Sequence, residues 1–94
     1  MTSNIKAPYP ITFRVDIAES RTFNIGNNTR AIIDVVGSSS AAKGTIYVYC
    51  SSTGAVSADK EGLSGATLTN GTNTLTVSGI SAQSFVRLYG GAIG

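Results

Sequence analysis

Alternation of apolar and polar residues is the sequence feature that most limits what this chain can fold into. It is clearest in the heptapeptide ITFRVDI (11–17), where every second residue is apolar. A repeat of two places one set of side chains on a single face of a β-strand, which can then be buried. Further strand-like runs, rich in β-branched and aromatic residues, are SRTFNI (20–25), RAIIDVVG (30–37), GTIYVYCS (44–51), NTLTVSG (73–79) and QSFVRLYGG (83–91).

Short segments rich in Gly, Asn and Ser separate these runs and predict turns and loops. GNNT (26–29) and NGT (70–72) are turn sequences, because Gly and Asn accept the positive φ that tight turns require. SSSAAKG (38–44) and ADKEGLSG (58–65) are expected to be polar loops, and the glycine within the second argues against a helix there. About seven or eight short strands at roughly ten-residue spacing favour one all-β domain over residues 11–94, a single antiparallel β-sandwich or jelly-roll-like fold.

The first ten residues have a different character and predict an extended N-terminal arm. They lack alternation, and they contain both prolines of the chain, Pro8 and Pro10, on either side of Tyr9. Proline fixes φ, cannot donate to a strand ladder and biases the preceding residue towards extended geometry. We therefore expect residues 1–10 to be a docking segment, with Ile5, Pro8, Tyr9 and Pro10 as its candidate contact residues.

The residue types needed for most catalysis and transition-metal binding are scarce. The chain has no histidine, which removes the commonest general base and the usual partner of a Ser or Cys nucleophile. Its single cysteine, Cys50, lies in a strand-like run, where a buried and inert thiol is expected. The sequence thus predicts a protein that is not an enzyme and has no cofactor.

Two groups of carboxylates are candidates for a metal site or a catalytic site. Asp59 and Glu61 are close in sequence and would offer oxygen ligands of the kind that Ca²⁺ prefers. The simpler interpretation is a solvated loop tip, because a lysine lies between them. Acid–base work on sugars by Asp16 or Glu19 with Asp34 would require a defined separation of the carboxyl groups, and the sequence offers no support for it.

Charge limits the choice of partners. Only 13% of the residues are charged, against about 25% in an average soluble domain, which indicates a neutral surface that neighbours partly cover. The net charge is +2 and the basic residues are scattered, so nucleic-acid binding is not expected. No apolar run approaches the ~18–20 residues that span a bilayer and no signal peptide is visible, so we expect synthesis in a cytoplasm and no membrane association.

Aromatic residues provide the remaining candidate contacts. Tyr47 and Tyr49 share one face of a strand-like run, and Tyr89 in the last run is expected to lie beside them. Ordinary packing of a half-buried sheet is the simpler interpretation. Exposed tyrosines also anchor protein interfaces or stack on sugar rings, so these three are candidate partner-binding residues.

A family resemblance adds to this reading. The segments SRTFNI (20–25), RAIIDVVGSSSAAKGTIYVYCSSTGAVS (30–57) and TNGTNTLTVSGISAQSFVRLYGG (69–91) resemble the small β-sandwich modules of tailed-bacteriophage virions. Such modules occur as capsid decoration (cement) proteins, head fibres and tail-fibre tips. The likeness lies in the short TFNI strand, the small-residue loop before a tyrosine-rich strand and the hairpin before the final FVRLYGG strand.

The resemblance implies a structural role in the virion. We expect a capsid decoration protein that docks on the major capsid protein or other virion proteins and stabilises the head lattice. Decoration is preferred because the chain starts with Met1 and is as short as a complete gene product. One alternative is a tail-fibre or head-fibre tip, for which a carbohydrate receptor would be the partner. A second is a carbohydrate-binding module, supported by the tyrosines alone.

A homotrimer is expected on the particle. A chain of this length builds a thin core, and apolar strand residues are therefore expected to need cover from another copy. The number three comes from the resemblance, because decoration proteins and fibres commonly occupy three-fold positions. The residues expected to be incompletely covered are Ile32, Val35, Val36, Val86 and Leu88.

Overall fold

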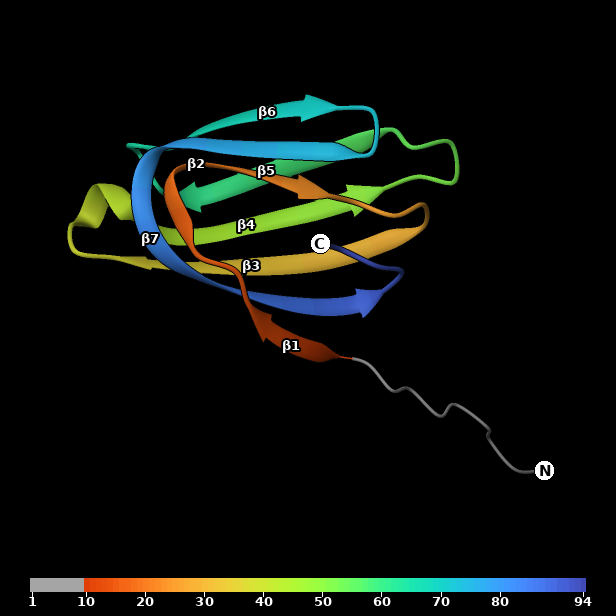
Figure 1. Ribbon diagram of the computed structural model, residues 1–94, viewed down its shortest axis with the longest axis horizontal. Helices are drawn as coiled ribbons and strands as arrows, with labels where there is room; N and C mark the ends of the chain where they lie inside the picture. The colour runs from red at the N-terminus through yellow and green to blue at the C-terminus, as the bar shows by residue number, and fades with distance from the viewer. Residues whose placement is uncertain (1–9) are drawn as a thin grey trace.

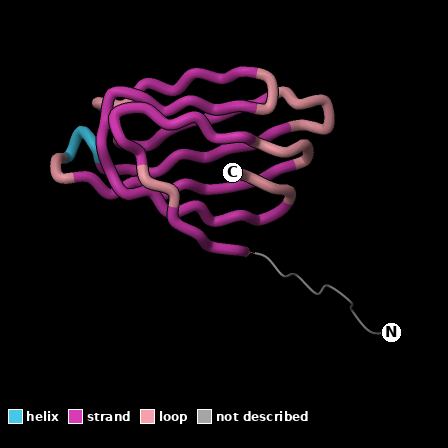
Figure 2. Tube along the Cα trace, viewed as in Figure 1, coloured by secondary structure: helices cyan, strands magenta, loops and turns pink. Residues whose placement is uncertain are grey.

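The computed structural model describes residues 10–94, so the expected arm lies outside the described part of the chain except for Pro10. The described residues form seven antiparallel strands and one turn of 3₁₀ helix (Figures 1 and 2). In chain order the elements are β1 (Ile11–Arg14), β2 (Ile17–Asn24), β3 (Thr29–Gly37), η1 (Ser40–Ala42), β4 (Lys43–Cys50), β5 (Val56–Gly62), β6 (Thr67–Gly71) and β7 (Thr74–Gly90).

Strand β7 joins two layers of strands. Its first half, residues 74–82, pairs with β2, and part of that half also pairs with β6. Its second half pairs with β1 on one side and β3 on the other, which gives a larger layer in the order β1-β7-β3-β4-β5. In Figure 1 the strand curls at one end of the molecule and runs back. The all-β, sandwich-like fold expected from the sequence is thereby confirmed.

Gly79 interrupts the regular pairing of β7 with β2. Glu19 pairs with Ile80 and Ser20 with Ser78, so Gly79 is the extra residue of a β-bulge. Its φ is +90°, and a Cβ atom there would lie 2.6 Å from the carbonyl oxygen of Gly65. A bulge bends its strand and sharpens the local twist, and only glycine adopts this conformation without strain.

The core fills the space between the layers and is built by the alternation seen in the sequence. On β4, for example, Ile46, Val48 and Cys50 are buried while Tyr47 and Tyr49 face outwards. The largest fully buried side chains come from both layers and the connections between them: Phe23, Ile25, Ile33, Ile46, Leu63, Leu75, Val77 and Val86.

Of the apolar residues expected to be incompletely covered, only some are exposed. Val35, Val86 and Leu88 are at most 5% exposed, so the second layer covers them. Ile32 is half-buried and Val36 is 51% exposed, and both lie on the outer face of the larger layer. The long bent β7 explains the difference, because it gives a short chain a closed second layer.

The segment 58–65, expected to be a polar loop, is mostly β-strand. Residues 56–62 form β5, which pairs with β4 at the edge of the larger layer. Edge strands often carry charged residues, which discourage pairing with other chains, and such a strand is easily mistaken for a loop. Lys60 does not lie at a solvated tip: its Nζ donates to the carbonyl oxygens of Leu63 and Ala66, both at 2.8 Å.

Two connections also differ from the sequence prediction, and a predicted turn is confirmed. The run 11–17 is broken into β1 and β2. The β6–β7 hairpin turns at residues 72–73 instead of 70–72, because Gly71 pairs directly with Thr74. The turn at 26–29 exists, but β2 and β3 are not hydrogen-bonded to each other, so it links the two layers.

The substitution Gly79→Ala is expected to destabilise the protein by about 1–3 kcal/mol, because alanine is strained at positive φ and its methyl group would press on the carbonyl of Gly65. Urea unfolding followed by circular dichroism measures the effect. Gly90→Ala is the matched control in the same strand, since a Cβ there meets nothing within 4 Å. Equal stability of the two variants would contradict the role given to Gly79.

Candidate functional site

An open groove of about 610 Å³ crosses the outer face of the larger layer. Its lining includes two buried residues, Ala31 and Val48. The other lining residues face outwards and come from four strands. The outward-facing residues that line it are Arg30, Ile32, Tyr47, Tyr49, Ser57, Asp59 and Tyr89.

Strand register brings these side chains together. Directly opposed residues in an antiparallel pair point to the same face, so Arg30 on β3 shares its face with Tyr49 on β4. Tyr47, in turn, shares its face with Asp59 on β5. Tyr89 comes from the end of β7, beside β3. The three tyrosines, which the sequence predicted to be neighbours, are 42%, 41% and 43% exposed in chain order.

Two polar groups differ in how they are engaged. The guanidinium of Arg30 lies over the ring of Tyr49, with its central carbon 5.0 Å from the ring centroid, so this cation is already paired with an aromatic face. The carboxylate of Asp59 has no ion pair or side-chain hydrogen bond with any of residues 10–94. The groove therefore presents an available negative charge beside its aromatic rings.

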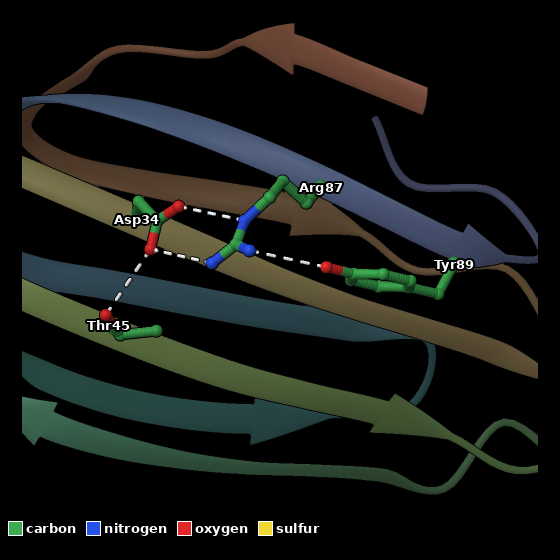
Figure 3. Close-up of polar contacts among 4 residues, drawn as sticks. All are labelled: Asp34, Thr45, Arg87 and Tyr89. Atoms are coloured by element: carbon green, nitrogen blue, oxygen red, sulfur yellow. Dashed lines mark hydrogen bonds and ion pairs between the residues drawn. The ribbon is translucent and has the colours of Figure 1, made fainter. Parts of the chain in front are cut away.

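An ion pair on β3 and β7 holds one end of the groove in place (Figure 3). The Nε of Arg87 lies 3.0 Å from Oδ2 of Asp34, and its Nη2 donates to Oδ1 at 3.2 Å. The same guanidinium donates from Nη1 to the Tyr89 hydroxyl at 3.3 Å, while Thr45 donates to Asp34 at 3.4 Å. Paired contacts of this kind fix orientation, so Tyr89 is held in position before anything binds.

Tyr47 is held by a second contact. Its hydroxyl donates a hydrogen bond to Oε1 of Glu61. This hydrogen bond, followed by partial burial and the charge of Glu61, raises the pKa of Tyr47 above that of an ordinary tyrosine. The neutral phenol is the form that donates to a carboxylate, so the contact favours the protonated form of Tyr47.

Sequence reasoning found part of this site. Tyr47, Tyr49 and Tyr89 meet in the groove, whereas Ile5, Pro8 and Tyr9 lie outside the described residues. Pro10 is exposed and immediately precedes β1. The lining residues that the sequence analysis missed are Arg30, Ile32, Ser57 and Asp59. The signal that identifies them is the pairing register of β3, β4 and β5, which local patterns do not specify.

The three carboxylates considered for acid–base work have different surroundings. Asp16 pairs with Arg14 at 2.8 Å, and Asp34 is held by Arg87. Glu19 lies on β2, in the other layer. Within residues 10–94 no three side chains of His, Cys, Asp or Glu come together as metal ligands. What the described groove offers is binding through aromatic rings, one guanidinium and one carboxylate.

Comparisons with protein-family models, with curated protein sequences and with solved structures found no match for this chain. Among residues 10–94 there is no helix with the length and apolar character required to span a bilayer.

The substitution Glu61→Gln is expected to lower the pKa of Tyr47 towards the ordinary value of about 10, because it removes the negative charge that stabilises the protonated phenol. The ring Cζ resonance of Tyr47, followed by NMR in an alkaline titration, measures this directly. Since the pKa is raised in the folded state, the contact contributes stability below the unfolded pKa and loses it as pH rises through the folded pKa. Glu19→Gln in the other layer is the control, and an unchanged Tyr47 pKa in Glu61→Gln would contradict the assignment.

Proposed function

We propose that this chain is a non-catalytic structural protein of a bacteriophage virion, and specifically a capsid decoration protein that binds through the outer face of its larger layer. The observation that carries the proposal is the groove with three half-exposed tyrosines, Tyr47, Tyr49 and Tyr89. Tyrosine is enriched among the residues that dominate binding at protein interfaces. The resemblance in strand order and loop composition supplies the virion context.

Pre-organisation of the groove supports a binding role. Tyr47 is held by Glu61, and Tyr89 by Arg87. A side chain that is already fixed loses little conformational entropy when a partner binds. The two polar contacts face outwards and so add little to core packing; their effect is to fix the tyrosine rings. The low charge of the chain, 13% of residues, agrees with a surface that is largely covered in an assembly.

The assembly proposed is a homotrimer on the head lattice, with the major capsid protein or other virion proteins as its support. The protein would be made in the host cytoplasm and end in the virion. The N-terminal segment, including Ile5, Pro8 and Tyr9, would add contact area to this assembly. Ile32 in the groove and exposed Val36 farther along the same face are apolar side chains that suit cover by a neighbour.

A fibre tip or carbohydrate-binding module is the second candidate. It is favoured by the combination of flat tyrosine faces with the unpaired carboxylate of Asp59, since sugar rings stack on aromatic faces and their hydroxyls donate to carboxylates. Titration of the ¹⁵N-labelled protein with soluble oligosaccharides distinguishes this candidate. Saturable shifts confined to the groove residues would favour it over decoration.

The double variant Tyr49→Ala/Tyr89→Ala is expected to bind phage heads that lack this protein at least about tenfold more weakly than the unmodified chain, because it removes two aromatic anchors. Co-sedimentation with the heads measures attachment. Its thermal midpoint should change little, since both side chains are over two fifths exposed. Thr69→Ala, at an exposed position of β6, is the control. Undiminished attachment of the double variant would contradict docking by this face.

Copy number tests the decoration role separately. A decoration protein is expected to be present in hundreds of copies per virion, comparable to the major capsid protein on a stained gel of purified particles. A few dozen copies or fewer would instead identify a fibre or spike component.

A further inference from the structure

We propose that the groove receives the N-terminal segment of a neighbouring copy of this chain, with Pro8-Tyr9-Pro10 against the tyrosines and Lys6 facing Asp59. The proposal rests on the proposed function in one respect, which is that copies of the chain lie side by side. The N-terminal segment is then the partner of the groove. Whether the assembled copies attach to a phage head is tested by a different experiment.

The chemistry of the groove fits a proline-containing segment. Extended proline-rich segments bind grooves lined by aromatic rings, because their backbone is already ordered and their rings pack flat on aromatic faces. Tyr47, Tyr49 and Tyr89 provide such a lining. The hydroxyls of Tyr47 and Tyr89 contact Glu61 and Arg87, while the hydroxyl of Tyr49 has no hydrogen bond with residues 10–94 and can donate to a backbone carbonyl.

Charge complementarity favours this occupant. Asp59 is the unpaired carboxylate of the groove, and the nearby cation, Arg30, lies over Tyr49. Lys60, next to Asp59 in sequence, points to the other face and donates to two backbone carbonyls. A partner with a cation close to its prolines would therefore complete the groove. The N-terminal segment has that arrangement, with Lys6 two residues before Pro8.

Topology favours a neighbouring copy over the chain's own groove. The segment joins the domain at β1, the edge strand of the larger layer, where Ile11 pairs with Leu88. The groove lies mainly over β3 and β4, beyond β7. To enter its own groove the segment would have to cross β7 from the edge strand β1.

Pro8 is three residues before Ile11, which is roughly 9 Å in an extended proline-type conformation, so the groove that receives it must lie directly beside the β1 edge of the first copy. A contact between the segment of one copy and the groove of the next is head-to-tail, and such contacts close into a ring when the rotation allows. In the proposed trimer each groove would hold the segment of the preceding copy.

Directed disulfide formation tests the proposal with full-length chains. One preparation carries Ala7→Cys in the segment, and a second carries Ser57→Cys in the groove, where Ser57 is exposed. Under mild oxidation the mixture is expected to form a mixed disulfide dimer. Thr69→Cys, exposed on β6 of the other layer, replaces Ser57→Cys as the control and should give about tenfold less dimer. Cys50 is buried, and the unmodified chain measures its background.

Further variants identify the contacts. Adding Tyr49→Ala to the groove partner, or Pro8→Ala/Pro10→Ala to the segment partner, should lower the dimer yield about tenfold. Lys6→Gln should lower it less, and high salt should have little further effect on that variant. Circular dichroism verifies that every variant is folded, and sedimentation equilibrium of chains without the introduced cysteines gives an independent measure of self-association. Self-association of the Asp59→Asn chain should be weaker than that of the unmodified chain.

Three results would overturn the proposal. Mixed dimers no more abundant than with Thr69→Cys would show that the segment does not enter the groove of another copy. A disulfide within one chain, formed by the Ala7→Cys/Ser57→Cys double variant at high dilution, would place it in its own groove. Saturation of the groove by an oligosaccharide, with equal affinity in the Pro8→Ala/Pro10→Ala variant, would identify a sugar site. If these failures occurred while Tyr49→Ala/Tyr89→Ala still lost attachment to heads, the decoration role would stand without this contact.

Discussion

The backbone hydrogen bonding of β7 is the constraint on which the rest of the structure depends. This one strand, Thr74–Gly90, pairs with β1, β2, β3 and β6 and belongs to both layers. Its bend at Gly79 turns one row of apolar residues inwards along its whole length, so that Leu75, Val77, Val86 and Leu88 are all buried. A short chain buries a smaller fraction of its apolar surface than a long one, which limits its stability. Here one continuous strand belongs to both layers, so the inner face of each layer is covered without a further loop between them.

The same arrangement determines where binding can take place. Because the second layer covers the inner face of the larger one, the outward-facing row of each strand in that layer remains exposed. Four adjacent strands then supply aromatic, cationic and anionic side chains to a single surface, and the Arg87–Asp34 pair together with Glu61 restrains two of the tyrosines. The groove is thus a property of the sheet and not of its loops, which gives it a rigid base.

The sequence predicted those features that depend on neighbouring residues in the chain, such as which face of a strand is buried. Alternation placed Ile46, Val48 and Cys50 inwards and Tyr47 and Tyr49 outwards, as the structure has them. It failed where local signals mislead. The runs 73–79 and 83–91 were expected to be separate strands but form one continuous strand with a bulge at Gly79. The charges of β5 are those of a loop but lie at a sheet edge. Arg30 and Asp59 could not be assigned to the site, because their neighbours are decided by register between strands distant in sequence.

The position of β7 along the chain has a consequence for how the protein is made. The strand that organises both layers is the last of the described strands, and it pairs with β1 and β2, the first two. Neither layer can be completed until residues up to Gly90 have been synthesised. Folds dominated by such distant pairings form slowly, since the entropy of closing long loops is lost before the contacts are gained. Until then the edges of β2 and β3 that β7 later covers stay open to pairing with other chains.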